Sequence, residues 1–131
     1  MGLGRLDKIL YEYYINDINL NVITKETAKE MLGNFLSILH VDYEYKSNEL
    51  LGDIGQLIIL GGNDKDGNYL CNDLTFMFID LVKELQIPDP KILLRVSKKT
   101  PKEIIESSVD CIKTGIGSPL LANDDIIIKS L

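Results

Sequence analysis

Two short apolar runs limit the folds that are open to this chain. Leu57–Leu60 is entirely apolar and ends in two glycines, and Ile92–Val96 is interrupted only by Arg95. Strands that are buried on both faces of a parallel sheet have this composition, because neither face needs a polar residue at alternate positions. A helical pattern separates the runs, so the connection is long enough for a crossover. The sequence therefore predicts an α/β fold with helices and parallel βαβ units.

Two amphipathic helices are expected before the first run. Residues 5–17 carry apolar side chains at helical spacing, and a second helix begins after Thr24 and continues to about residue 42. Thr24 suits the N-cap because its hydroxyl accepts a backbone N–H, and Glu26 in the first turn suits the helix dipole. We expect one single segment over residues 1–131, helical over about 1–50 and βαβ over about 55–131.

Cap residues mark the two helices of the βαβ part. Asn72 is expected to cap a mostly buried helix that Pro88-Asp89-Pro90 ends, because proline cannot continue the hydrogen-bond ladder. Thr100-Pro101-Lys102-Glu103 predicts the next helix, with threonine as the N-cap, proline at the first helical position and glutamate completing a capping box. Both helices are thus predicted from their first residues.

The last part of the chain is expected to return to the sheet. Gly115 or Gly117 would supply the left-handed end of the second crossover helix. A short strand over Pro119–Ala122, a turn and a further apolar segment over Asp125–Ile128 would follow. The exposed final segment would then end the chain without an element to cover it.

The composition fits a globular protein and argues against a membrane span and against nucleic acid as a partner. The 131 residues include 45% hydrophobic ones, which is enough for a buried core without disulfides or a structural metal. No apolar run approaches the roughly 20 residues of a membrane span, and Met1–Arg5 lacks the apolar core of a signal peptide, so a cytoplasmic location is expected. The net charge is −6 with scattered lysines, which argues against nucleic acid as a partner.

The usual metal and thiol motifs are not present. Cys71 and Cys111 lie far apart without a CxxC pattern, so buried free thiols are favoured over a disulfide or a nucleophile. His40 has no second histidine or cysteine at ligand spacing and is interpreted as a surface or partly packed side chain. No metal site is expected.

The loop after Gly61-Gly62 has three possible interpretations. A calcium loop would put Gly62 at the first position, where a carboxylate is required. A phosphate loop lacks both glycine-rich signatures, and the carboxylates of Asp64 and Asp66 would repel an anion. A tight turn fits the Asn, Asp and Gly composition best.

Arg95 needs a partner because an unpaired charge in an apolar strand is costly. Asn123, Asp124 and Asp73 are the candidates. A structural ion pair is favoured over a clamp for substrate, and both remain open at this point.

Several motifs occur in an order that resembles one known family. They are Gly4-Arg5-Leu6-Asp7 before a tyrosine-rich helix, the apolar strand into Gly61-Gly62, Asp64-Lys65-Asp66-Gly67, Asn72-Asp73-Leu74-Thr75, Pro90 followed by Arg95, Thr100-Pro101, and Gly115-x-Gly117-x-Pro119 before Asn123-Asp124. Together they resemble glycyl radical enzymes, the family of pyruvate formate-lyase (formate C-acetyltransferase) and the B12-independent diol, choline and hydroxyproline-type lyases and dehydratases.

The resemblance implies an enzyme of anaerobic metabolism with a ten-stranded α/β barrel. In that family two opposed loops inside the barrel carry a thiyl-forming cysteine and a glycine. A partner activase, using S-adenosylmethionine and an iron-sulfur cluster, places a radical on the glycine, and the enzyme is a homodimer. Cys71 and Cys111 do not match the catalytic cysteine, and neither loop lies in residues 1–131. The chain alone is therefore expected to have no catalytic residue and no cofactor, and to be an inactive internal fragment.

The resemblance also names candidate residues and partners. Substrate-pocket or barrel-lining candidates are Gly61, Gly62, Asn72, Arg95, Asn123 and Asp124. The expected partners are the remainder of the parent enzyme or a complementing chain, and the activase for the parent. Leu93 and Ser97 stand where many members have serine and histidine, which leaves the substrate class open. The alternative function is a stand-alone acidic α/β protein-interaction module that uses the apolar end of the chain.

Overall fold

The computed structural model describes residues 2–49 and 55–131. Within them a four-stranded sheet has the order β1-β2-β3-β4, and every neighbouring pair is parallel. The strands are β1 (Gly2–Arg5), β2 (Leu57–Gly61), β3 (Lys91–Val96) and β4 (Leu120–Asn123). The predicted α/β class and the parallel βαβ units are confirmed.

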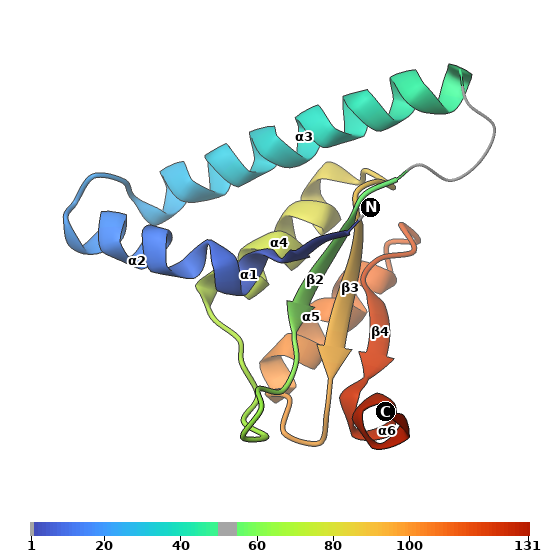
Figure 1. Cartoon of the computed structure of the whole chain (residues 1–131). Coiled ribbons are helices and arrows are strands. Elements are labelled where there is room, and N and C mark those ends of the chain that lie inside the picture. Colours follow the sequence, from blue (N-terminus) through green and yellow to red (C-terminus); the bar gives the residue numbers. More distant parts are fainter. Residues whose placement is uncertain (1, 50–54) are drawn as a thin grey trace.

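One face of the sheet holds the core. Ile58, Leu60, Ile92 and Leu94 are fully buried, whereas the intervening Ile59 and Leu93 are only partly buried. Helices α4 (Asp73–Leu85) and α5 (Lys102–Ile112) both lie behind the sheet in Figure 1 and contact each other. The expectation of burial on both faces is therefore wrong for the described residues, because both crossover helices cover the same face.

The helical part differs from the prediction at its two ends. The helix predicted over residues 5–17 is two short helices, α1 (Leu6–Ile9) and α2 (Tyr11–Asn19), and Arg5 belongs to the strand β1 that precedes them. Helix α3 (Lys25–Glu49) runs past the predicted end near residue 42. Its predicted cap is confirmed, since the Thr24 hydroxyl accepts the Thr27 N–H at 3.1 Å.

The two crossover helices begin differently. Asn72 caps α4 as predicted: its Oδ1 accepts the N–H groups of Leu74 and Thr75 at 2.9 and 3.3 Å, and Thr75 Oγ1 accepts the Asn72 N–H at 3.1 Å. The predicted Thr100 cap on α5 is wrong, because its hydroxyl accepts the Ser97 N–H at 2.8 Å and closes the turn before the helix.

The chain ends in a helix. Gly115 is left-handed (φ +84°) and donates its N–H to Ile112 at 3.0 Å, which supports its predicted role after α5. The short strand near residues 119–122 is confirmed as β4. The apolar segment after it is α6 (Asp124–Ser130), which leaves Ile126 66% exposed.

Candidate functional site

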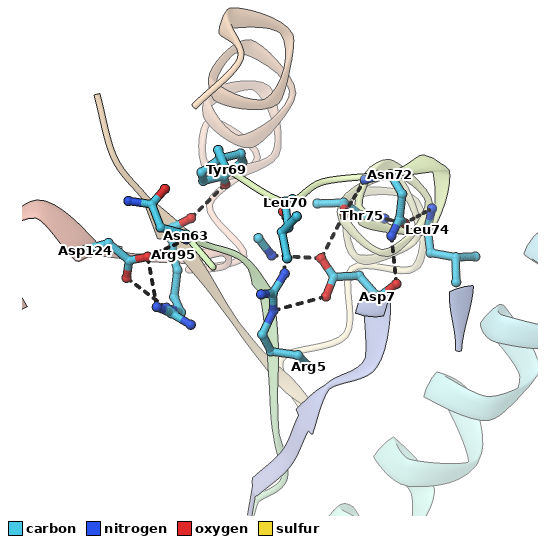
Figure 2. Close-up of polar contacts among 11 residues, drawn as sticks. Arg5, Asp7, Asn63, Tyr69, Leu70, Asn72, Leu74, Thr75, Arg95 and Asp124 are labelled. Atoms are coloured by element: carbon cyan, nitrogen blue, oxygen red, sulfur yellow. Dashed lines mark hydrogen bonds and ion pairs between the residues drawn. The ribbon is translucent and has the colours of Figure 1, made fainter. Parts of the chain in front are cut away.

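Polar side chains gather where the parallel strands end. The carboxyl ends of β2, β3 and β4 lead into Gly61-Gly62-Asn63, Arg95 and Asn123-Asp124, and Asp7 follows β1. Ligands of open parallel sheets bind outside these ends. We call the set Asp7, Gly61, Gly62, Arg95 and Asp124 the carboxyl-edge cluster. Figure 2 labels its three charged members, Asp7, Arg95 and Asp124.

Asp7 is the first buried acid of the carboxyl-edge cluster. Its side chain is fully buried and its Oδ2 accepts the Gly61 N–H at 2.8 Å and the Thr75 hydroxyl at 2.9 Å. Arg5 Nε lies 3.7 Å from Asp7 Oδ1, which is an ion-pair distance without a hydrogen bond. Asp7 therefore ties β1 to the end of β2 and to helix α4.

Asp124 is the second buried acid, and it lies on the opposite side of the same turn. Its carboxylate receives Arg95 Nε at 2.8 Å and Arg95 Nη2 at 2.9 Å, so the pair is bidentate. Oδ2 also accepts the Asn63 N–H at 2.8 Å. Asp124 is thus the partner of Arg95, and of the three predicted candidates it is the one that makes the ion pair.

The two glycines allow Arg95 to approach the backbone. Gly62 has φ +100°, and a Cβ there would lie 2.9 Å from Arg95 Cζ and Nε. Gly61 has φ +64°, and a Cβ there would meet the Tyr69 hydroxyl and the Arg95 carbonyl. Any larger residue would displace the guanidinium or the turn, so the Gly61-Gly62 pair is required by this packing.

The loop after the glycines is a turn, as predicted. Asp64 Oδ1 accepts the N–H groups of Asp66 and Asn68 at 2.9 and 2.8 Å, and these backbone hydrogen bonds lower the pKa of the Asp64 carboxyl. The Tyr69 hydroxyl donates to the Arg95 carbonyl at 2.7 Å, and burial raises its pKa. The loop therefore folds back onto the end of β3.

The other two predicted site residues act as helix caps. Asn123 Oδ1 accepts the Asp125 N–H at 3.0 Å at the start of α6. Asn72, besides capping α4, donates its Nδ2 to the Asp7 carbonyl at 2.8 Å. Asp73, the remaining candidate partner of Arg95, instead lies 3.2 Å from Lys25 Nζ. The structure thus brings the predicted residues to one edge, with Asn72 on the Asp7 side.

The pairing register places both arginines on the uncovered face of the sheet. Arg95 pairs with Gly61 and Ala122, and Arg5 pairs with the half-buried Ile59. Partners in a parallel pair point to the same face, and this face alternates with the one that carries the buried core. The two arginines therefore border the face that α4 and α5 do not cover, whereas Asp7 reaches Thr75 on α4.

The thiols are poorly suited to nucleophilic chemistry. Cys71 is partly buried and Cys111 is buried, and both are free. Burial raises the pKa of each thiol, and Asp7 and Glu103 raise that of Cys71 further. A raised pKa leaves less thiolate at neutral pH.

Other predicted features of the described residues can be placed. His40 Nε2 lies 3.2 Å from Glu44, and its side chain is 17% exposed, so it is partly packed. Over residues 2–49 and 55–131 no group of three or more His, Cys, Asp or Glu is arranged to hold a metal ion. None of the helices in these ranges is long and apolar enough to cross a membrane.

The fold and the carboxyl-edge cluster define an α/β protein whose candidate site is at the end of a parallel sheet. A model of the PFL-like (pyruvate formate lyase-like) family matches residues 1–131. The chain belongs to this family. The recognised resemblance to glycyl radical enzymes is therefore confirmed.

Individual relatives agree with this assignment. The chain is 31% identical over its full length to (2S)-3-sulfopropanediol dehydratase of Klebsiella oxytoca, and 25% identical over 98% of its length to trans-4-hydroxy-L-proline dehydratase of Clostridioides difficile. It spans 17% of the length of each of these two relatives. They are enzymes, but this chain corresponds to a small part of them.

Solved structures show the same arrangement. The B12-independent glycerol dehydratase of Clostridium butyricum, with glycerol bound, matches 99% of this chain at 26% identity with a TM-score of 0.82. A protein solved for 1,2-propanediol dehydration in Roseburia inulinivorans matches 96% at 28% identity, also with a TM-score of 0.82. The chain covers 17% and 16% of these two structures.

Asp7 is the residue of the cluster that sequence reasoning missed. It appeared only as part of the Gly4–Asp7 motif and was not named as a candidate site residue. A signal was present, since a carboxylate lies beside Leu6 and close to Leu10 in a segment expected to bury its apolar face. A buried carboxylate needs donors, and here Gly61 and Thr75 supply them.

Proposed function

We propose that this chain forms part of the barrel wall of a glycyl radical enzyme of the dehydratase or lyase type. The observation that carries the proposal is that Asp7 and Asp124 hold one glycine turn from two sides, at the carboxyl edge of a parallel sheet with one uncovered face. The named relatives that share the family act in dehydration, decarboxylation or sulfite release. The proposed substrate pocket borders the uncovered face.

Each residue has a proposed task in that pocket. Arg95, held by two hydrogen bonds to Asp124, keeps its guanidinium in a fixed orientation beside Gly62. Asn72 and Asn123 fix the helices that follow the edge. The candidates proposed to line or brace the pocket are Gly61, Gly62, Asn72, Arg95, Asn123 and Asp124. A rigid wall of this kind orients a substrate without entering the chemical step.

The remaining parts of the reaction are proposed to come from other chains or segments. A glycyl radical installed by an S-adenosylmethionine iron-sulfur activase would supply hydrogen-atom abstraction through a cysteine thiyl. Cys71 and Cys111 are not proposed for that role, because neither matches the position of the catalytic cysteine in the order of the family's motifs. We therefore propose that residues 1–131 alone are inactive, and that the active enzyme is a cytoplasmic homodimer.

The experiment that tests this proposal extends the reading frame in the source DNA. A frame that continues into a cysteine loop and a glycine loop is expected. The longer product, treated anaerobically with an activase and S-adenosylmethionine, should show a glycyl radical by electron paramagnetic resonance, whereas the 131-residue chain should not. A frame without either loop, together with a stable folded monomer, would favour the stand-alone interaction module.

A variant pair tests the pocket wall within the longer enzyme. Arg95→Lys removes the bidentate pair and should lower turnover while the radical signal stays the same. Lys102→Arg is the control, because the Lys102 side chain is 85% exposed on α5. Equal turnover of the two variants would show that Arg95 does not shape the pocket.

A further inference from the structure

Helix α3 is the outermost of three helices that follow the order of the strands. It lies in the connection from β1 to β2, α4 lies in that from β2 to β3, and α5 in that from β3 to β4. Helix α3 contacts α4, and α4 contacts α5. Connections between neighbouring parallel strands are right-handed, so their helices line up on one face of the sheet. We call α3, α4 and α5 the helix row.

Helix α3 lies alongside α4 and runs in the same direction. Lys25 Nζ lies 3.2 Å from Asp73 at the start of α4, and a Cβ on Gly33 would lie 3.3 Å from Leu81 Cδ2. The two contacts are eight residues apart on each helix, from 25 to 33 and from 73 to 81. The close approach at Gly33 therefore marks the side of α3 that faces α4.

The side of α3 opposite α4 carries apolar side chains. At about 100° per residue, Met31, Phe35 and Ile38 lie within about 60° of one another and roughly 140–160° from Gly33. They are 59%, 37% and 68% exposed. Steps of four and three residues are typical of a helix face that packs against another element. We call Met31, Phe35 and Ile38 the outer stripe of α3.

Burial along the helix row depends on the number of neighbouring helices. Helix α4, which has a neighbour on each side, buries seven of its residues. Over residues 25–44, where the structure describes its side chains, α3 buries Ala28, Gly33 and Leu36. Helix α2 borders the outer stripe at Met31, which lines a cavity of about 160 Å³ together with Tyr13. In Figure 1 α3 lies at the outer end of the row, and none of the described elements lies beyond it.

We propose that the outer stripe is covered by the next helix of the row, which belongs to the parent enzyme and lies outside residues 1–131. The proposal rests on the proposed function, because it requires a parent enzyme. The chain spans 17% of the two dehydratases named above, so most of an enzyme of that length lies outside the described row. A parallel strand added beside β1 would bring its own crossover helix to the far side of α3. The expected partner is a helix with an apolar face.

One variant in proteins of two lengths tests the proposal. In the 131-residue chain Ile38 is largely exposed, so Ile38→Glu should leave the thermal midpoint unchanged. In the longer product of the reading-frame experiment, the same change places a charge against the next helix and should lower the midpoint by roughly 3 °C or more. Ile38→Leu is the control and should change neither midpoint, because it stays apolar at nearly the same volume. An equal response of the two lengths to Ile38→Glu would overturn the proposal.

Circular dichroism of the 131-residue variant separates loss of the contact from loss of folding. This variant should keep the spectrum of the unchanged chain. If the longer product fails to fold only as Ile38→Glu, the result therefore counts as the expected loss. If the 131-residue variant unfolds as well, Ile38 stabilises the described domain itself, and the proposal is wrong.

Hydrogen exchange locates the contact without a variant. Amides of residues 31–38 should exchange at least about tenfold more slowly in the longer product than in the 131-residue chain, because α3 is then packed on both sides. Amides of α4 are the reference and should slow less, since α4 already has two neighbours. Equal slowing of both helices would indicate general stabilisation and contradict the proposal.

Sedimentation equilibrium tests a second copy as the occupant. If Ile38→Glu abolishes a dimer of the 131-residue chain, or separates the subunits of the longer product, a second copy covers the outer stripe and the proposal is wrong. A reading frame that does not continue would refute this proposal together with the proposed function. A longer product that forms the glycyl radical, but responds to Ile38→Glu as the 131-residue chain does, would refute this proposal alone.

Discussion

Two buried aspartates hold the same turn in different ways. Asp7 accepts hydrogen bonds from the Gly61 N–H and the Thr75 hydroxyl, while its arginine, Arg5, remains at 3.7 Å. Asp124 is bound by its arginine at 2.8 and 2.9 Å and accepts one backbone N–H, from Asn63. The first serves mainly as a hydrogen-bond acceptor, and the second mainly as half of an ion pair.

The difference shows what each side of the turn depends on. The donors of Asp7 are buried, so water cannot replace the carboxylate if it is removed. The Arg95 side chain is 28% exposed and can reach solvent if Asp124 is lost. The Asp7 side should therefore be important for stability, and the Asp124 side for the orientation of Arg95.

Removing Asp7 should have the largest effect. Asp7→Ala leaves the donors of Gly61 and Thr75 unsatisfied and Arg5 without its charge partner, so we expect a loss of about 4 kcal/mol in the free energy of unfolding. Urea denaturation followed by circular dichroism measures it. Asp7→Asn keeps an acceptor and should cost less than half as much. If the two variants cost the same, the charge of Asp7 is the essential property and the comparison fails.

Removing Asp124 should cost less. Asp124→Ala breaks the bidentate pair, but the partly exposed Arg95 gains water, so we expect a loss of about 2 kcal/mol. A double-mutant cycle with Arg95→Ala, measured by the same denaturation, isolates the pair. A coupling energy near zero would show that Asp124 acts through the Asn63 N–H alone.

Replacing Asn72, which lies on the Asp7 side of the turn, should have a smaller effect on the free energy of unfolding. Asn72→Ala removes the cap of α4 and the hydrogen bond to the Asp7 carbonyl, for an expected loss of about 1 kcal/mol or somewhat more. Asn72→Asp keeps the cap and removes only the donor to Asp7. Thermal unfolding of the two variants separates the contributions, and equal losses would show that the link to Asp7 outweighs the cap.

Of these changes, alkaline pH should lower the free energy of unfolding least. The pKa of Tyr69, on the Arg95 side, is raised above 10.0, and that of Cys71, beside Asp7, is raised above 9.0, in both cases mainly by burial. The folded chain therefore keeps protons that the unfolded chain releases, so stability is complete below about pH 9 and falls as the pH rises through the folded values. Urea midpoints from pH 7 to 11 measure this. Tyr69→Phe should flatten the upper part of the curve, and an unchanged curve would exclude Tyr69 as a cause.

The strands that the sequence predicted are those with strong local signals. Leu57–Gly61 and Lys91–Val96 have apolar runs that fit a buried parallel strand, and Asn72 is a residue type preferred at the N-cap. The strand at Gly2–Arg5 was missed because two of its four residues are glycine, which disfavours strands. Its structure depends on pairing with β2, far away in the sequence.

In the candidate site, too, residues with a strong local signal were predicted, and a residue that depends on distant contacts was missed. The partner of Arg95 was among three predicted candidates, because charge balance in an apolar strand limits the choice. Asp7 could not be assigned in this way, since its donors are a glycine N–H and a threonine hydroxyl, which have no distinctive sequence pattern. Thr100 was wrongly predicted to cap α5. Its hydroxyl could accept a backbone N–H either from the helix or from the turn before it, and in the structure it accepts the Ser97 N–H of the turn.

The glycine turn also has a consequence for the order of folding. Its two hydrogen bonds to aspartate join residues that are 54 and 61 positions apart, one reaching toward the start of the chain and one toward its end. Contacts of such long range slow folding, because the intervening chain must be ordered before they form. During synthesis Asp7 precedes the turn, and Asp124 is the last of these residues to be added. Arg95 therefore has its carboxylate partner only once the chain has reached Asp124.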